Sequence, residues 1–266
     1  MSEYYDLTPY IIFHNLLDKG IYICSITTIY RILRKAGLMK QREKNIRGKH
    51  ESIEISATGI NQLWSWDITY LKTNISGKFF YLYLFLDIWS RAIVGWEVFE
   101  AESGEKAKQL FLNLAKNNNV ENLTLHSDNG SPMISSTFRA TLEKLGVRES
   151  FSRPRVSNDN AYSESLFKTL KSNILYPERF NTIEDAKKWV ASFVDWYNNK
   201  HLHSRIGYVT PMQRHNGEDK IIFKRRNSLI QKAKNENPGR WSKTSRKYEH
   251  TKQMFLKKGN YTKNSA

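Results

Sequence analysis

Cysteine and long apolar runs are the features that this 266-residue chain lacks most clearly. Its one cysteine, Cys24, cannot form an internal disulfide or a cysteine zinc site, and it fits a reducing compartment. The longest apolar run, residues 79–86, is far shorter than the about 20 residues that a helix needs to span a bilayer. The N-terminus shows no basic and apolar signal pattern. We therefore expect a cytoplasmic protein that has no membrane partner.

Acidic residues are scarce relative to basic ones, and the excess positive charge is unevenly placed. Lys and Arg number 42 against 26 Asp and Glu, which gives a net charge of +16. Residues 61–211 carry 18 basic and 16 acidic side chains, whereas residues 212–266 carry 15 basic and only 4 acidic ones. A basic tail with Trp241 and Tyr248 interleaved favours a nucleic-acid partner over a tail that is merely soluble. The hydrophobic content of 39% argues against wholesale disorder.

The N-terminal part has the pattern of two short helices within residues 8–37. Thr8 and Ser25 can each cap one of them. The apolar side of the second helix consists of Ile29, Ile32 and Leu33. This pattern is compatible with a helix-turn-helix whose second helix enters the DNA major groove, and also with a plain helical hairpin. We assign residues 1–40 to this helical segment and the polar, basic residues 41–60 to a linker.

The middle of the chain, residues 61–211, alternates strand and helix patterns. Apolar patterns predict strands at 63–71, 78–88, 92–99, 122–126 and 147–151. Helical spacing predicts helices at 103–117, 135–145, 160–176 and 182–198. Three adjoining strands followed by alternating units predict an α/β fold, a mixed five-stranded sheet with helices on both faces. Residues 212–266 are expected to form a basic C-terminal DNA-binding region, partly helical at 220–234.

Three acidic residues occupy informative places in this pattern. Alternation puts Asp67 in mid-strand, on the face opposite to its bulky aromatic neighbours. Asp128 ends an apolar strand, and chemistry in open α/β sheets gathers at such carboxyl ends. Glu164 lies near the start of a helix. Taken singly, each has an ordinary explanation: a strand residue bonded to a loop, a turn before Asn-Gly, and a first-turn acid that the helix dipole favours.

The combination of the three acids is more specific than any one of them. Carboxylates from strand ends and a helix can converge on two metal ions about 4 Å apart, which activate an attacking oxygen and stabilise a leaving oxygen. Two Asp and one Glu, with no Cys or paired His nearby, suit Mg²⁺, or Mn²⁺ in its place, rather than zinc. Lys168 and Lys171 lie beside Glu164 at helical spacing. They fit either phosphate contacts or an ordinary surface Glu–Lys pair.

With these residues in place, the chain resembles bacterial insertion-sequence transposases that have a retroviral-integrase-like catalytic core and are encoded in two overlapping reading frames. It resembles the product of the second frame. The resemblance covers nearly the whole chain, and it is specific because many short motifs occur in order. The motifs are NQLWSWDIT (61–69), LDIWSR (86–91), VGW (94–96), HSDNGSPM (126–133), SRPRVSNDN (152–160), SESLFKTLK (163–171), WYNN (196–199), HLHS (201–204) and TP (210–211).

The resemblance implies a ribonuclease-H-like core that catalyses metal-dependent DNA cleavage and strand transfer. It maps the acidic triad onto Asp67, Asp128 and Glu164, with two Mg²⁺ ions as cofactor, and it implies that Lys171 contacts donor DNA. The implied partners are the insertion-sequence ends and the target DNA, further copies of the chain on that DNA, and the first-frame protein, fused or associated. We therefore expect the protein to be nucleoid-associated.

Arg153 and Arg155 flank a proline in the loop before the Glu164 helix. They fit a DNA clamp, and equally a solvated loop. Other polar residues are expected to be structural: Asp87 in a turn or in a salt bridge with Arg91, His126 as a hydrogen-bonded histidine, and His201 and His203 in a structural or phosphate-binding role.

Two rival functions are compatible with the sequence. One is a nuclease or RNA-strand hydrolase of the same fold that performs no joining step, against which the basic tail and the extent of the resemblance argue. The other is a DNA-binding accessory or inhibitor that lacks activity without the first-frame product.

Overall fold

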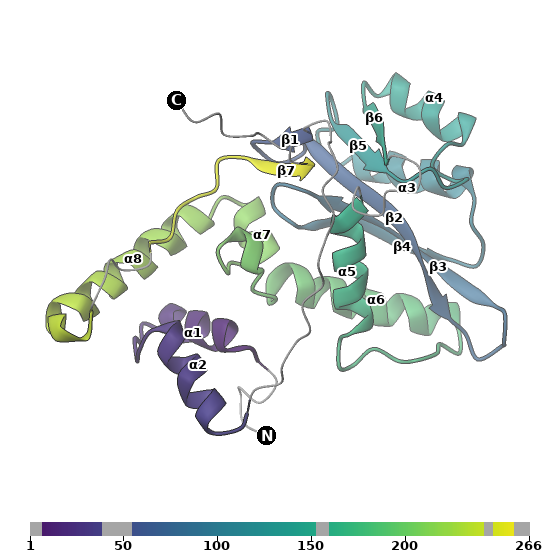
Figure 1. Cartoon of the computed structure of the whole chain (residues 1–266). Coiled ribbons are helices and arrows are strands. Elements are labelled where there is room, and N and C mark those ends of the chain that lie inside the picture. Colours follow the sequence, from purple (N-terminus) through teal and green to yellow (C-terminus); the bar gives the residue numbers. More distant parts are fainter. Residues whose placement is uncertain (1–6, 39–54, 153–159, 242–246, 258–266) are drawn as a thin grey trace, which may run out of the picture. The chain divides into compact units, whose positions relative to one another are not determined.

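The computed structural model describes residues 7–38, 55–152, 160–241 and 247–257 (Figure 1). These residues form two compact units. The larger unit contains residues 55–152, 160–201, 210–215 and 251–257, and the smaller unit contains residues 7–38, 202–209, 216–241 and 247–250.

A mixed five-stranded sheet forms the centre of the larger unit. Its strands in chain order are β2 (Leu63–Lys72), β3 (Phe79–Asp87), β4 (Ile93–Phe99), β5 (Thr124–Ser127) and β6 (Arg148–Phe151). Their spatial order is β4-β3-β2-β5-β6. The first three strands pair antiparallel, and β5 and β6 continue the sheet parallel to β2. The sheet expected from the sequence, with three adjoining strands followed by two separated by helices, is confirmed.

One face of the sheet carries the main apolar core. Trp64 and Trp66 of β2 are almost completely buried there, and the Trp66 ring stacks on Phe85 at 5.1 Å and meets Phe138 edge-on at 5.2 Å. Two helices supply the rest of this core: α3 (Gly104–Ala115) and α4 (Ser136–Lys144). Because side chains alternate along a strand, burying these tryptophans turns Ser65 and Asp67 to the opposite face.

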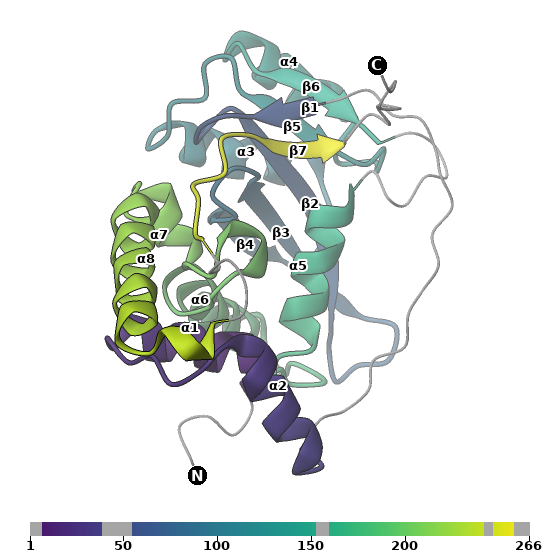
Figure 2. The same cartoon turned by 60° about the vertical axis from the view of Figure 1, so that its left-hand side comes forward.

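The opposite face of the sheet is covered by α5 (Ala161–Lys171) and α6 (Ile183–Asn199). Figure 2 shows α5 lying along β2, the strand that carries Asp67. At its C-terminal end α6 is tied to the sheet by Asn198, whose side chain bonds both the N–H and the carbonyl of Ile93, each at 2.9 Å. Helices therefore lie on both faces, as the sequence predicted.

A second, two-stranded sheet in the larger unit was not predicted from the sequence. It pairs β1 (Ile55–Ala57) antiparallel with β7 (Met254–Lys257), so the predicted linker contains a strand at its end. The short helix α7 (Pro211–His215) lies in the same unit and carries the buried Arg214. Both strands are short, and they pair across nearly the whole length of the chain, which local patterns cannot reveal.

The smaller unit is helical and combines residues 7–38 with later segments of the chain, from residue 202 to residue 250. Its helices are α1 (Pro9–Asp18), α2 (Ile26–Lys35) and α8 (Asp219–Glu236), with 3₁₀ turns at Ser204–Ile206 and Pro238–Arg240. The guanidinium of Arg226 is fully buried and binds both carboxylate oxygens of Asp18 at 2.9 Å. It also donates to the carbonyls of Gly207 and Tyr208, at 2.8 and 2.7 Å. Charge and hydrogen bonds are thus both satisfied, which a buried arginine requires.

The predicted caps of α1 and α2 are confirmed, whereas the apolar side of α2 is only partly buried. Thr8 and Ser25 do cap α1 and α2, because their side chains accept from Ile11 N and Thr28 N. The apolar side predicted for α2 is not fully buried, since Ile32 is 57% exposed.

The predicted helix at 160–176 is too long, because α5 ends at Lys171. Beyond it, Asn173 accepts the N–H of Leu175 on its side chain and that of Tyr176 on its carbonyl, at 2.9 Å each. This turn competes with further helix. Ile174, within the predicted helix, is 80% exposed.

None of the helices in the described parts of the chain combines the length and apolar character needed to cross a membrane.

Candidate active site

Asp67 lies in the middle of β2, and both oxygens of its carboxylate accept hydrogen bonds. Oδ1 accepts the backbone N–H of Ile68 at 2.7 Å, and Oδ2 accepts the side-chain N–H of Asn160 at 2.8 Å. The pKa of Asp67 is raised to about 7, mainly by burial and also by the negative charges of Asp128 and Glu164, although its two hydrogen bonds lower it. The ionised carboxylate is therefore costly in this environment, and a bound cation would stabilise it.

Asp128 follows directly after β5, at the carboxyl end of that strand. Its Oδ1 accepts the N–H of Gly130 at 2.9 Å, and the side chain of Asn129 donates to the carbonyl of Ser152 at 2.8 Å. A Cβ at Gly130 would lie 2.9 Å from the Met133 sulfur and 3.1 Å from the Asp128 carboxylate. The turn therefore holds Asp128 closely, and a side chain at Gly130 would require Met133 to shift.

Glu164 lies in the first turn of α5, and its side chain is exposed. The start of this helix is tied to β2 on the face that carries Asp67. The Ser163 and Ser65 hydroxyls are 2.9 Å apart, and Ser65 also donates to the Asn160 side-chain carbonyl at 3.1 Å. The helix that carries Glu164 is thus connected by polar side chains to the strand that carries Asp67.

The three acids lie close enough to influence one another through their charges, since both Asp128 and Glu164 raise the pKa of Asp67. Their carboxylates are not gathered around one position where an ion could contact all three. Among the residues that the structure describes, no three His, Cys, Asp or Glu side chains already form a cluster that could hold a metal ion. The donors themselves, carboxylate oxygens only, fit a hard cation such as Mg²⁺. Such an ion would have to draw the side chains together.

Asn160 contacts the proposed site and was not predicted from the sequence to do so. In the sequence it was noted only as the last residue of the motif SRPRVSNDN (152–160). It occupies the N-cap position of α5 but makes no capping hydrogen bond with its side chain. The side chain instead joins Asp67 to Ser65. The available signal was the strand alternation, which puts Ser65 on the same face as Asp67.

The predicted DNA-contacting lysines lie on the exposed side of α5, where Lys168 and Lys171 are both exposed. Partial burial lowers the pKa of Lys171, and the nearby positive charge of Lys72 at the end of β2 adds to this. Lys72 is therefore a further basic residue close to Lys171. Arg153 and Arg155 lie outside the described residues.

The residues expected to be structural occupy structural positions. The buried Asp87 carboxylate accepts from Asn61 N at 2.8 Å and from the N–H and hydroxyl of Ser90 at 2.7 and 2.8 Å, which supports the turn interpretation. The buried His126 ring bonds Ser150 at 3.0 Å and Ser152 at 3.2 Å. His201 packs against two aromatic rings at the end of α6.

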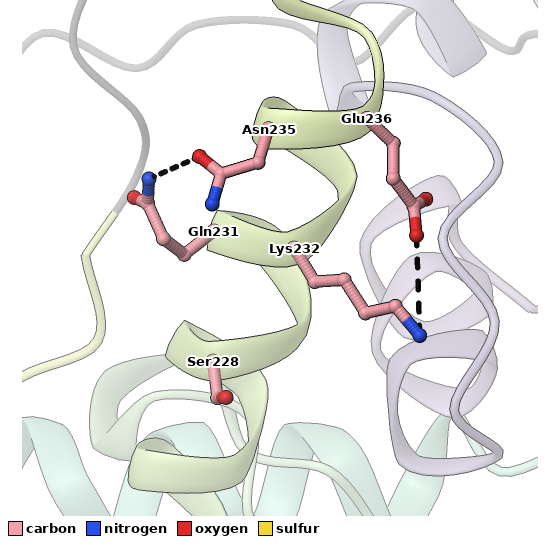
Figure 3. Close-up of a pocket in the computed structure, with 5 residues that line it drawn as sticks. All are labelled: Ser228, Gln231, Lys232, Asn235 and Glu236. Carbon is pink, nitrogen blue, oxygen red and sulfur yellow. Dashed lines mark hydrogen bonds and ion pairs between the residues drawn. The ribbon is translucent and has the colours of Figure 1, made fainter.

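A surface depression of about 510 Å³ lies along α8, in the smaller unit (Figure 3). Its side chains pair with one another along the helix, Gln231 with Asn235 at 2.9 Å and Lys232 with Glu236 at 3.9 Å. These i,i+4 pairs are those of a solvated helix surface, and they offer no catalytic arrangement.

Comparison with known proteins agrees with this geometry. Two family models described as "Integrase core domain" match residues 57–157 and 145–211. The transposase of insertion sequence element IS904 from Lactococcus lactis is 34% identical over 157 residues, which cover 58% of this chain and 61% of that transposase. The transposase InsF of insertion sequence IS3A from Escherichia coli is 33% identical over 159 residues, 59% of this chain and 54% of InsF. The matched segment thus spans little more than half of these relatives.

The fold also has a counterpart among solved structures. A chain of the cryo-EM structure of the simian T-cell lymphotropic virus intasome in complex with PP2A regulatory subunit B56 gamma matches with a TM-score of 0.53 and 17% identity, covering 72% of this chain and 67% of that chain. At this identity the likeness concerns the fold alone, and the ribonuclease-H-like class expected from the sequence is confirmed. Through residues 57–211, the chain belongs to the integrase core domain family, and its relatives by sequence are transposases of bacterial insertion sequences.

Proposed function

We propose that the chain is a transposase that cleaves DNA at insertion-sequence ends and joins those ends to target DNA. What supports the proposal is the placement of the three acids: Asp67 lies in β2, Asp128 directly follows the neighbouring strand β5, and Glu164 lies in the first turn of α5, which Ser163 connects to Ser65 of β2. The family and the transposase relatives support the same conclusion.

In the proposed mechanism, Asp67, Asp128 and Glu164 would hold two Mg²⁺ ions, for which Mn²⁺ could substitute. When bound, such ions supply positive charge that activates an attacking oxygen and stabilises a leaving one. Asn160 holds the Asp67 carboxylate in orientation through its 2.8 Å hydrogen bond. The nucleophile is water in the cleavage step and a DNA 3′-hydroxyl in the joining step, so no side chain of the protein attacks the phosphate.

The remaining parts of the proposal concern DNA and partners. Lys168 and Lys171, with Arg153 and Arg155 in the preceding segment, bind phosphates of the DNA. We infer that residues 1–40 and 212–266 also bind DNA, that 41–60 link the first segment to the core, and that 61–211 form the catalytic core. The chain acts as a homo-oligomer on DNA, fused to or associated with the first-frame protein. A DNA partner also implies a cytoplasmic, nucleoid-associated location.

The test of the proposal is a metal-dependent DNA assay with a matched pair of variants. Glu164→Gln removes the charge of the proposed metal ligand and keeps its size. Glu184→Gln does the same to an exposed first-turn glutamate of α6. We expect wild type and Glu184→Gln to nick or join supercoiled plasmid in Mn²⁺ or Mg²⁺ but not in chelator. Glu164→Gln should lose the activity by about 100-fold or more and retain DNA binding.

An active Glu164→Gln variant would contradict the assignment of the triad. If the DNA is cleaved but no joined product forms, the protein would instead be identified as a nuclease. DNA binding without any metal-dependent product from wild type would favour an accessory or inhibitory protein.

A further inference from the structure

Three segments that are distant in sequence meet around the side chain of Tyr162, in the first turn of α5. The guanidinium carbon of Arg91, in the turn between β3 and β4, lies 3.9 Å from the centre of the Tyr162 ring. The Tyr162 hydroxyl donates to the backbone carbonyl of Phe255 in β7. The ring is thus held on its face by a cation and at its tip by a hydrogen bond. Tyr162 is two residues from Glu164, in the same turn of helix.

The Arg91 side of this arrangement is fixed by its own turn. Arg91 is 4% exposed and adopts a φ of 66°, a left-handed conformation that a side-chain-bearing residue keeps only where its surroundings hold it. Its N–H donates to the Asp87 carbonyl at 2.8 Å. The Asp87 carboxylate in turn binds Asn61 and Ser90. These bonds hold the turn that carries Arg91 in place, and its guanidinium contacts the Tyr162 ring from this fixed position.

The Phe255 side belongs to residues 251–257, which we call the C-terminal strap. Phe255 pairs with Ser56 in the antiparallel β1–β7 ladder, and Gln253 donates to the Ser56 hydroxyl at 2.8 Å. At the start of the strap, Arg214 donates to the carbonyl of Thr251 at 2.9 Å. The same guanidinium donates to the carbonyl of Trp89, also at 2.9 Å, in the turn that carries Arg91. The strap and the turn are thus joined to each other as well as to Tyr162.

We propose that Arg91, Tyr162 and the C-terminal strap position α5 so that Glu164 is held for its role in the DNA reaction. This inference rests on the proposed function and extends it to three positioning elements outside the acidic triad. Ser163 and Asn160 tie the sheet side of the α5 start to β2. Tyr162 ties another side of the same turn to Arg91 and the strap. Contacts on more than one side fix a helix against rotation, and a displacement of about 1 Å at a reacting group can cost about 100-fold in rate.

The experiment compares two tyrosine variants of the full chain that each lose one hydroxyl bonded to a backbone carbonyl. Tyr162→Phe removes the bond to Phe255. The control, Tyr83→Phe, removes the bonds of the Tyr83 hydroxyl on β3 to the Ser103 carbonyl at 3.3 Å and from the Ser103 N–H at 2.8 Å, neither of which involves α5. Two properties are measured for each: the rate of cleavage of a labelled insertion-sequence-end oligonucleotide in Mn²⁺ as a function of DNA concentration, and hydrogen–deuterium exchange of the amides in residues 161–166.

For Tyr162→Phe we expect the rate at saturating DNA to fall about fivefold, the factor that one hydrogen bond of ordinary strength contributes, with an unchanged half-saturating DNA concentration. Exchange in the first turn of α5 should become faster. Tyr83→Phe should change neither. A second variant, Tyr162→Leu, also removes the ring that faces Arg91, and a larger fall in the saturated rate is expected from it.

The outcomes separate this inference from the proposed function. An inactive wild-type chain would contradict the proposed function, and unchanged exchange in Tyr162→Phe would then overturn the positioning role as well. With an active wild type, an unchanged saturated rate in both Tyr162 variants would overturn the inference even if exchange rises. A rise only in the half-saturating DNA concentration would also overturn it, because positioning of Glu164 predicts a loss in the chemical step.

Discussion

Single residues decide how the acidic site is held, and Asn160 is the clearest case. Its side chain donates to Asp67 and accepts from Ser65, so it connects the strand of one proposed metal ligand to the helix of another. An amide suits this position because it offers a donor and an acceptor without adding a fourth negative charge. A carboxylate there would lose the donor and repel Asp67.

Replacing Asn160 by Ala should therefore lower both activity and stability. We expect metal-dependent DNA cleavage to fall at least about tenfold, because Asp67 loses its orienting donor, and the free energy of unfolding in urea to fall by about 1–2 kcal/mol. The matched control is Asn199→Ala, which removes an amide that donates to Asp195 at 2.9 Å on the exposed side of α6. If both variants cleave DNA at the wild-type rate, Asn160 does not orient Asp67.

At the scale of elements, the end of α6 is a place where burial changes the pKa of a histidine more than the helix dipole does. A histidine beyond the last turn of a helix usually has a raised pKa, because the dipole favours its positive form. His201 lies there against the rings of Trp196 and Tyr197, at 4.9 and 5.4 Å between centres. Burial lowers its pKa from 6.5 to about 4. The folded protein therefore keeps this ring neutral at pH 5, whereas the unfolded chain protonates it.

This difference predicts a specific loss of stability in acid. Because the unfolded state binds the additional proton, His201 should leave stability unchanged above pH 6.5 and reduce it progressively as the pH falls toward 4, by at most about 2 kcal/mol at pH 5. Urea unfolding of wild type and His201→Phe at pH 7.5, 6 and 5 measures how the free energy of unfolding changes with pH in each protein. We expect the variant to lose less stability than wild type between pH 7.5 and 5. Parallel pH dependences would contradict the lowered pKa.

Elements were predictable from the sequence where a local pattern fixes them. Each strand of the main sheet was expected within a few residues, since continuous or alternating apolar residues define β2 and β3. Strands β1 and β7 were not, because each is short and gains its partner from the other end of the chain. The three acids were predicted as a site from their places in the strand and helix pattern and from the resemblance. Their connection through Asn160 was not, because hydrogen bonds between a strand and a helix 93 residues away leave no local pattern.

At the scale of the whole molecule, charge should govern DNA binding. The region from residue 212 onward holds 15 basic and 4 acidic side chains, and in α8 Lys220 and Lys224 are exposed. Each phosphate contact that is removed should lower the slope of log affinity against log salt concentration by about 0.9. We expect the Lys220→Gln, Lys224→Gln double variant to reduce this slope by up to about 2.

The control for this measurement is Lys108→Gln in the larger unit, where Lys108 pairs with Glu105 at 3.0 Å. Fluorescence anisotropy with a labelled duplex over a range of salt concentrations gives the slopes. Equal slopes for the double variant and wild type would mean that α8 adds solubility rather than phosphate contacts.

The buried pair of Asp18 and Arg226 also has a consequence for synthesis on the ribosome. The two residues are 208 positions apart, so α1 emerges long before the guanidinium that neutralises its last residue. At roughly 5–20 residues per second, the wait is roughly 10–40 s. During that time the whole central sheet is translated, while the helices at the start of the chain lack α8. The smaller unit is therefore completed only after the central sheet has been translated, and a chain that stops before Arg226 leaves Asp18 without this partner.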